Sequence, residues 1–349
     1  MNKQAIMDKY KDKGITPGRK YARSDITEKL RDIANILIRE AYGKEYTDKI
    51  CLSDLRKMII QKSEKKALYD SQVIETVSED LKKLESRIKR YEAGDTGEEK
   101  ARKALQMFHF EHCKLHSVFL SNKNGSAEYD DLVITPRGIF IIEVKNICTD
   151  ILIKKNGYLY RKNEHKEPEY LGNLGEAMER KRFVLWGALS DDIKENICVD
   201  DIHLVLLYVG RGVVDNDLDW VDVCYSSNIC RYIEGYNNEG RRILLEVMEK
   251  IYRRINSVNE PNVWELGVDI DKYAEHFSNA LNVVGCEESK SIPVKVRRKH
   301  LHISHTKTPS HSVRRNILPQ RNTSNHKNEL FMLMTFFIAA RTYMEYNFD

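Results

Sequence analysis

The sequence predicts a mixed α/β fold, in which a sheet of parallel and antiparallel strands is flanked by helices. Apolar residues recur at helical spacing over residues 25–92, and extended segments follow between residues 117 and 161. A nearly continuous apolar run at residues 203–209 is typical of a buried central strand. The 349 residues, of which 41% are apolar, provide enough hydrophobic mass for about two domains.

The N-terminal part is predicted to be helical. Ser24 or Asp25 can cap a first helix, and Ser53 begins a second segment that keeps its apolar spacing to about Tyr91. This pattern indicates a helical pair or short coiled coil that serves packing, dimerisation or docking of a partner. The segment EAGDTG at residues 92–97 predicts a break, after which residues 98–108 form a short helix.

The segments that follow suit a mixed sheet. Strands are expected at residues 117–120, 129–135 and 139–145, and a hairpin at 151–161 turns at Asn156-Gly157. A helix is expected at 174–189, the central strand at 203–209, and two helices at 227–236 and 241–255. We therefore divide the chain into a helical module (1–92), an α/β core (93–257), a helical extension (258–288), a basic linker (289–328) and an apolar helix (329–349).

The net charge of +4 conceals an asymmetry along the chain. Residues 289–328 contain ten Lys or Arg, five His and no acid, so the rest of the chain has 47 Lys or Arg against 53 acids. Such a segment attracts a polyanion without reading its sequence, and Arg297, Arg298 and Lys299 are candidate nucleic-acid contacts within it. The alternative is a solvated linker.

Cysteine usage and hydropathy bear on the compartment. The seven cysteines are scattered without a CxxC pair, which favours reduced thiols in the cytoplasm over a disulfide framework. The first residues lack the apolar region of a secretory signal, and the longest apolar stretch, at residues 330–340, is too short to span a bilayer. We expect no membrane association.

The stretch EYDDLVITPRGIFIIEVKN, residues 128–146, concentrates the chemistry. Pro136 and Gly138 predict a tight turn, which would place Asp130 of one strand close to Glu143 and Lys145 of the next. Carboxylate and carbonyl oxygens are the ligands that Mg²⁺ prefers, and Asp130, Glu143 and the Val144 carbonyl can supply them. A neighbouring lysine can orient or help deprotonate a water and offset charge on a pentavalent phosphate. The arrangement is typical of phosphodiester cleavage.

A simpler explanation is an ion pair at the end of an apolar strand, which needs no metal. Three features favour the catalytic interpretation. Asp130 precedes Glu143 by thirteen positions across a turn, and both strands are otherwise so apolar that an unpaired Glu143 would be costly. Glu98, at the start of the predicted helix, provides a further acid.

The run GEEKARKAL, followed by EYDDLVITPRGIFIIEVKN, resembles the nuclease-related domain (NERD), a branch of the PD-(D/E)XK nuclease superfamily. The resemblance covers about residues 97–209. It implies a restriction-endonuclease-like core and hydrolysis of nucleic acid, usually DNA, with Mg²⁺ or Mn²⁺. It assigns Glu98 as the helix acid, Asp130 as the first strand acid, and Glu143 and Lys145 as the E-x-K pair, with Glu98, Asp130, Glu143 and Val144 around the metal.

The sequence also departs from this family. Members often have a Gln-bearing motif in the next helix after Asn-Pro, whereas this chain has Asn173-Leu174-Gly175-Glu176. Arg180 and Lys181 of that helix are candidate nucleic-acid contacts, with solvated charges as the alternative. Asp131 should face the other side of its strand and is interpreted as structural.

Other chemistries have weaker support. A zinc site could be formed by His109, His112, Cys113 and His116, whose spacing resembles a metal-binding cluster. A change from helix to strand within this segment should, however, point these side chains in different directions. The leading hypothesis is a metal-dependent nuclease, for DNA processing or defence against foreign DNA. The alternatives are a non-catalytic nucleic-acid-binding or sensor protein on a nuclease-like scaffold, and a subunit active only in a larger assembly. The pattern leaves open DNA or RNA, single or double strands, and endo- or exonucleolytic cleavage.

Overall fold

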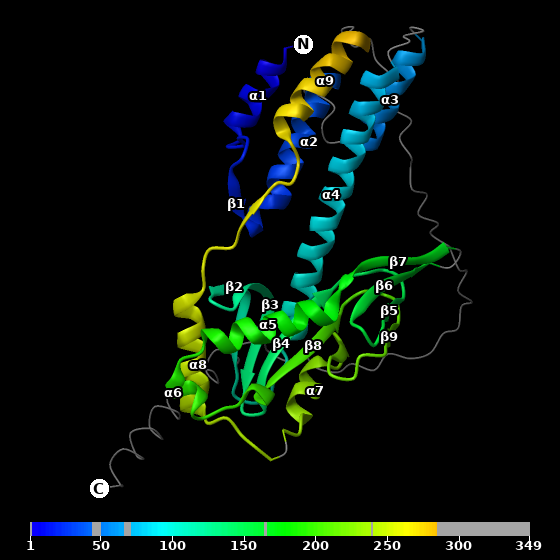
Figure 1. The fold of residues 1–349 in the computed structure, drawn as a ribbon. Helices are drawn as coiled ribbons and strands as arrows, with labels where there is room; N and C mark the ends of the chain where they lie inside the picture. Colours follow the sequence, from blue (N-terminus) through cyan, green and yellow to red (C-terminus); the bar gives the residue numbers. More distant parts are fainter. Residues whose placement is uncertain (1, 44–49, 66–70, 164–165, 239, 285–349) are drawn as a thin grey trace, which may run out of the picture. The chain divides into compact units, whose positions relative to one another are not determined.

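The computed structural model describes residues 2–43, 50–65, 71–163, 166–238 and 240–284 (Figure 1). Apart from short 3-10 turns, its helices and strands in chain order are α1 (Lys3–Asp12), β1 (Lys20–Ala22), α2 (Ile26–Tyr42), α3 (Leu52–Lys65), α4 (Ser71–Ala104), β2 (Cys113–Asn122), β3 (Gly125–Thr135), β4 (Gly138–Lys145), β5 (Ile151–Ile153), β6 (Tyr158–Asn163), β7 (Lys166–Asn173), α5 (Leu174–Ala188), α6 (Asp191–Lys194), β8 (Ile202–Tyr208), β9 (Val214–Asn216), β10 (Asp222–Tyr225), α7 (Ile229–Gly235), α8 (Leu245–Val258), β11 (Val263–Glu265) and α9 (Ile270–Val284). The basic linker and the apolar segment after it lie outside the described residues.

The predicted mixed sheet is confirmed. Five strands lie in the order β10-β8-β4-β3-β2, with β10, β8 and β4 parallel and with β3 antiparallel to both β4 and β2. The tight turn at Pro136 joins β3 to β4 and pairs Thr135 with Gly138. Gly138 has a φ of 141°, and a Cβ there would lie 2.4 Å from the His203 ring, so this turn requires glycine.

Side chains alternate between the two faces of this sheet, as the period of two demands. Ile139 and Ile141 of β4 join a core formed with α5 and α8, whereas Phe140 and Ile142 join a second core formed with α7 and the C-terminal end of α4. Both faces are therefore covered by helices, with α5 running across one of them (Figure 1). Because β4 and β8 are buried on both faces, their sequences read as continuous apolar runs.

The predicted break at residues 92–97 is wrong, and so is the separate helix at 98–108. Helix α4 continues without interruption from Ser71 to Ala104. Gly97 is needed for close packing, because a Cβ there would lie 2.8 Å from the Cβ of Asn146 just beyond β4. Asp95 accepts hydrogen bonds from Arg23 (3.0 Å) and Thr27 (2.6 Å), so its side chain is engaged by the helix-α2 region. Tertiary contacts thus override the local breaker signal.

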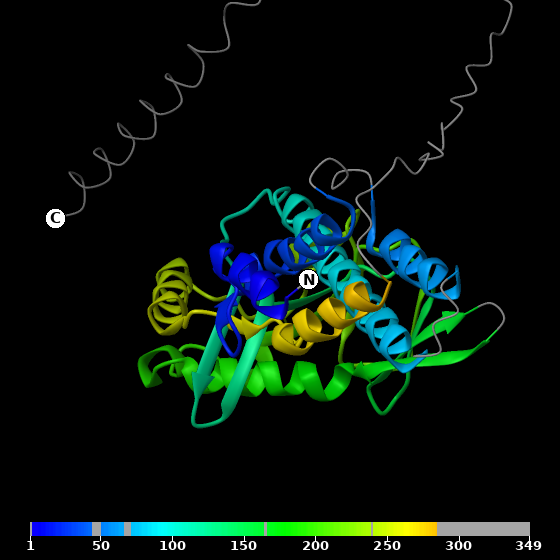
Figure 2. The same cartoon turned by 90° about the horizontal axis from the view of Figure 1, so that it is seen from above.

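The helices α1, α2, α3 and α9 and most of α4 form a separate hydrophobic cluster. Helix α9, from the predicted C-terminal extension, packs with α1, α3 and the N-terminal half of α4 (Figure 2). The strand pair β1–β11 joins residues 20–22 to 263–265, and a second sheet has the order β7-β6-β5-β9. The hairpin turn at Asn156-Gly157 is confirmed, with Gly157 at a φ of 81°. Among the described residues, no helix has the length and hydropathy needed to cross a membrane.

Candidate active site

Strands β3 and β4 separate at Asp130. Their backbone pairing runs from Thr135 opposite Gly138 to Asp131 opposite Ile142. Beyond that point the Asp130 carboxylate takes the place of a β3 backbone carbonyl as the hydrogen-bond acceptor. Its Oδ2 accepts a hydrogen bond of 2.7 Å from the Val144 N–H. The partner strand β2 is also irregular here, since Ser117 has a φ of 50° and is unpaired between His116 and Val118. The separation turns the Asp130 carboxylate toward the end of β4.

Glu143 lies between two lysines at this end of β4. Its Oε1 accepts a hydrogen bond of 2.5 Å from Lys145 Nζ, and its Oε2 accepts one from Lys181 Nζ of α5. The Glu143 side chain is 13% exposed and that of Lys181 is 10% exposed, so these charges are largely removed from bulk water. Glu143 shares the sheet face of Ile141, which α5 covers, and this explains how a helix residue reaches it.

The two carboxyl groups differ in their proton affinity. Burial and the nearby Glu143 raise the pKa of Asp130 to about 7, and the two lysines only partly counteract them. Burial would also raise the pKa of Glu143, but Lys145 and Lys181 outweigh it and hold that pKa well below its usual range. Burial would lower the pKa of Lys145, yet Glu143 and Asp130 raise it, so this lysine is a cation at neutral pH.

The backbone N–H and C=O of Val144 point to the side of β4 where Asp130 lies. In an extended strand the N–H and C=O of one residue point to the same side. The Val144 N–H points to Asp130, while the Lys145 carbonyl on the opposite side accepts from Val209 of the neighbouring chain segment after β8. The Val144 carbonyl therefore points to the side that β3 has vacated, which is where Asp130 lies.

Glu98 is held apart from Asp130 and Glu143. It lies in α4 and accepts from Arg23 Nη2 at 3.3 Å. Burial raises its pKa, against the effect of Arg23, and both Asp95 and Glu128 add to the increase. Within the described residues, no three His, Cys, Asp or Glu side chains form a group that could hold a metal ion. The expected meeting of Glu98 with Asp130 and Glu143 is therefore not seen.

Glu128 is a site residue that the sequence interpretation missed. Its charge contributes to the raised pKa of both Glu98 and Lys145. It also accepts a hydrogen bond of 2.7 Å from Asn262, in the segment before β11. The spacing of two between Glu128 and Asp130 was the available signal, because alternate strand residues share a face.

Asp131 and the His/Cys segment have structural roles. As expected, Asp131 lies on the other side of its strand, is 2% exposed and pairs with His116 of β2. His112 pairs through Nδ1 with the Phe110 carbonyl at 2.8 Å, whereas Cys113 already belongs to β2. The segment is thus split between a loop and a strand, which separates the candidate zinc ligands.

The candidate nucleic-acid contacts fall into three situations. Arg180 of α5 is exposed, whereas Lys181 is buried beside Glu143 and is not a solvated charge. Arg297, Arg298 and Lys299 lie outside the described residues.

Asn173, at the position where the family often has Asn-Pro, caps α5 by accepting a hydrogen bond of 3.1 Å from the Glu176 N–H.

Comparison with known proteins adds a family match. A family model described as a nuclease-related domain matches residues 93–206. No curated protein and no solved structure matches the chain. The resemblance to the nuclease-related domain is thereby confirmed for a segment that contains Glu98, Asp130, Glu143, Lys145 and Lys181. This segment supplies α4's C-terminal end, strands β2–β8 and helix α5.

Proposed function

We propose that this chain is a metal-dependent nuclease that hydrolyses phosphodiester bonds of DNA. The observation that carries the proposal is the meeting of the Asp130 and Glu143 carboxylates beside the Lys145 ammonium, where β3 and β4 separate. The nuclease-related match over residues 93–206 supports the same class of activity.

The donor set fits a hard divalent cation. Burial raises the pKa of Asp130 and the incompletely offset charge of Glu143 adds to the increase, and a bound cation would counteract both. Asp130, Glu143 and the Val144 carbonyl would hold Mg²⁺ or Mn²⁺, which commonly takes one or two protein carboxylates and completes its shell with water and substrate phosphate. Such an ion supplies Lewis-acid polarisation of a phosphate oxygen and a lowered pKa of bound water.

The remaining residues prepare the site electrostatically. Lys181 holds Glu143 from the α5 side and leaves the other oxygen to Lys145. Since Lys145 is protonated at neutral pH, its role is to stabilise negative charge on the phosphate rather than to accept a proton from water. Glu98 is tied to Arg23, which precedes α2, and the charge of Glu128 contributes to its raised pKa.

A nuclease assay with matched variants tests the proposal. Supercoiled and linear DNA are incubated with the full chain and Mg²⁺ or Mn²⁺, and thermal melts monitor folding. Asp130→Ala and Glu143→Gln should abolish cleavage while the protein stays folded. Glu246→Gln, an exposed acid on α8, should leave cleavage unchanged. Full activity of Asp130→Ala would disprove the assignment.

A non-catalytic nucleic-acid-binding or sensor protein is the second candidate. It is favoured by the placement of Glu98, which is paired with Arg23 instead of joining Asp130 and Glu143. The two lysines around Glu143 also satisfy that carboxylate without a metal. DNA binding by the full chain, with no cleavage in either metal, would support this candidate over the nuclease.

A further inference from the structure

A basic groove lies along the N-terminal half of α4, remote from the E-x-K pair. Its volume is about 560 Å³, and the loop before α9 forms its other wall. We call it the α4 basic groove, and its lining residues are Glu79, Lys82, Lys83, Ser86, Arg87, Arg90, Gly267, Val268 and Tyr273. Four cationic side chains and one acid give it a strongly positive wall.

The cations of the groove are available to a ligand. Lys82, Lys83 and Arg90 are exposed. Lys83 makes only a long ion pair of 3.7 Å with Glu79, of which both partners are more than half exposed. In the part of the chain that the structure describes, Lys82 and Arg90 have no hydrogen bond or ion pair. Exposed like charges at this density repel one another, and a polyanion would relieve that repulsion.

One side of the groove is rigid. Arg87 donates from Nε to the Leu266 carbonyl and from Nη2 to Tyr91 at 3.4 Å. Gly267 makes this possible, because a Cβ there would lie 2.0 Å from Arg87 Nη2. The loop before α9 is thereby fastened to α4, and the positive wall has a fixed edge.

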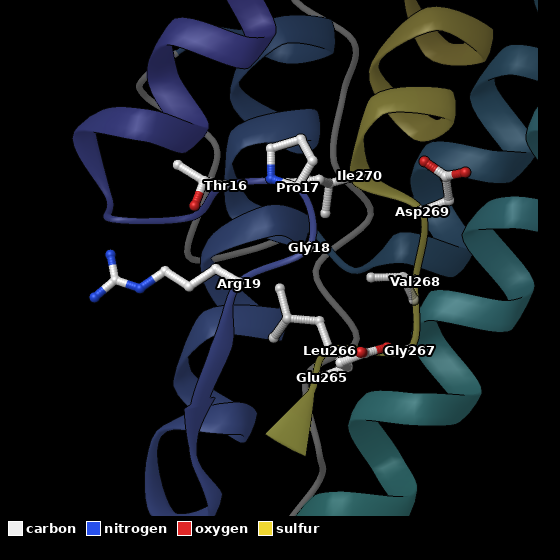
Figure 3. A pocket seen from close by; sticks show the side chains of 10 residues that line it. All are labelled: Thr16, Pro17, Gly18, Arg19, Glu265, Leu266, Gly267, Val268, Asp269 and Ile270. Atoms are coloured by element: carbon white, nitrogen blue, oxygen red, sulfur yellow. The ribbon is translucent and has the colours of Figure 1, made fainter. Parts of the chain in front are cut away.

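The neighbouring hollow has a different character. It lies on the other side of the loop at residues 265–270, has a volume of about 410 Å³ and is lined in part by residues 16–19 (Figure 3). Its charged residues are Arg19, Glu265 and Asp269, which are of mixed sign (Figure 3). Of these two hollows, the α4 basic groove is the one with a predominantly positive lining.

The face of α4 that carries the groove continues to Glu98. Lys83, Arg87, Arg90, Gly94 and Glu98 follow one another at spacings of four, three, four and four, so they lie on one face of the helix. From Lys83 to Glu98 the helix rises about 22 Å, at about 1.5 Å per residue. A nucleic-acid strand with a rise of about 3.4 Å per nucleotide covers that length in about six nucleotides.

Arg23 continues the line where α4 itself has no cation. Gly94 leaves room for its guanidinium, since a Cβ at residue 94 would lie 3.3 Å from Arg23 Nη2. Arg23 and Arg87 lie against the Tyr91 ring, at 4.9 and 5.4 Å from its centroid. Arg23 then pairs with Asp95 and Glu98, so its charge is offset at the end nearest the site.

We propose that the α4 basic groove binds the phosphodiester backbone of the nucleic acid, about six nucleotides along α4 from Glu98 and away from the bond that is cleaved. This inference rests on the proposed function for the position of that bond. An isolated basic hollow would suit any anion, whereas a row of cations along one face of α4, continued by Arg23, suits an extended polyanion. The groove then contributes affinity and not chemistry, since its lining includes none of Asp130, Glu143 and Lys145.

The test compares two triple variants of the full chain. The first is Lys82→Ala/Lys83→Ala/Arg90→Ala. The control is Lys123→Ala/Arg242→Ala/Lys250→Ala. It also removes two lysines and one arginine, but from exposed positions outside the groove. Binding of a fluorescein-labelled duplex DNA of 30 base pairs is measured by anisotropy from 50 to 200 mM salt. Cleavage of the same duplex gives kcat and KM, and thermal melts confirm folding.

The groove variant should bind DNA about tenfold or more weakly at 0.1 M salt, and its plot of log affinity against log salt should be shallower by about 2.7, for three lost phosphate contacts. Its KM should rise while kcat at saturation is retained. The control should match the wild type. Unchanged affinity and slope in the groove variant, or equal losses in both variants, would overturn the inference, as would displacement of DNA by polyglutamate of equal charge.

Failure of the proposed function gives a different result. If the wild type cleaves nothing but the groove variant alone loses DNA affinity and salt slope, the groove binds nucleic acid and the nuclease assignment is wrong. If the wild type cleaves DNA and the groove variant does so with an unchanged KM, the nuclease assignment stands and the groove inference is wrong.

Discussion

Replacing Asp130 with asparagine tests the electrostatics of the site in the absence of metal. The carboxyl group has an ordinary pKa of 3.8, and burial together with Glu143 raises it to about 7 in the folded chain. Because the folded pKa is above the unfolded one, ionised Asp130 lowers the free energy of unfolding. This penalty is absent below pH 3.8, increases as the pH rises toward 7, and is constant above it.

The size of the effect follows from the shift. At about 1.4 kcal/mol per pKa unit, the full penalty is about 4 kcal/mol, and about 2.5 kcal/mol of it develops between pH 5 and pH 8. Asp130 is half-buried and retains contact with water, so we expect about 1 to 2 kcal/mol. Asparagine keeps a side-chain oxygen that can accept from the Val144 N–H, which leaves the local hydrogen bond in place.

Urea unfolding in EDTA at pH 5, 6, 7 and 8 measures this difference. The wild type should lose stability relative to Asp130→Asn as the pH rises, whereas Glu246→Gln should follow the wild type. Adding Mg²⁺ at pH 8 should stabilise the wild type and not Asp130→Asn, since an ion that binds the folded state stabilises it by mass action. Parallel pH profiles for the wild type and Asp130→Asn would refute the assignment of a raised pKa to Asp130.

Three further changes separate the roles of other parts of the chain. Lys145→Met should lower kcat by about a hundredfold or more and change DNA affinity little, because phosphate charge is stabilised most in the transition state. Equal losses in single-turnover rate and in DNA affinity would show that Lys145 binds the substrate phosphate without favouring the transition state. Removal of residues 289–349 should weaken DNA binding and flatten its salt dependence while metal-dependent cleavage at low salt persists; an unchanged salt slope or a complete loss of activity would contradict this. Gly97→Ala should destabilise the fold by about 1 to 3 kcal/mol in urea unfolding, since its Cβ would lie 2.8 Å from that of Asn146. Gly94→Ala should cost less, because its Cβ would meet only the movable end of Arg23 at 3.3 Å. Equal effects of the two changes would argue against close packing at Gly97.

Several features of this protein could be predicted from its sequence because their causes are local. The continuous apolar runs at residues 139–142 and 203–208 identify strands buried on both faces, and Asn156-Gly157 identifies a hairpin turn. The turn at Pro136 places Asp130 and Glu143 on adjacent strands. Strand alternation then distinguishes Asp130 from Asp131, and the structure places them on opposite sides of β3.

Other features depend on segments that are distant in the chain. The continuity of α4 through residues 92–97 relies on the approach of Gly97 to Asn146 and on the bonds from Arg23 and Thr27 to Asp95. The position of Glu98 follows from Arg23, 75 residues before it, and the second lysine at Glu143 comes from α5, 38 residues after it. Sequence patterns report backbone preferences over a few neighbouring residues, whereas the partner of a buried charge is selected by whichever elements the folded core brings within a few ångströms.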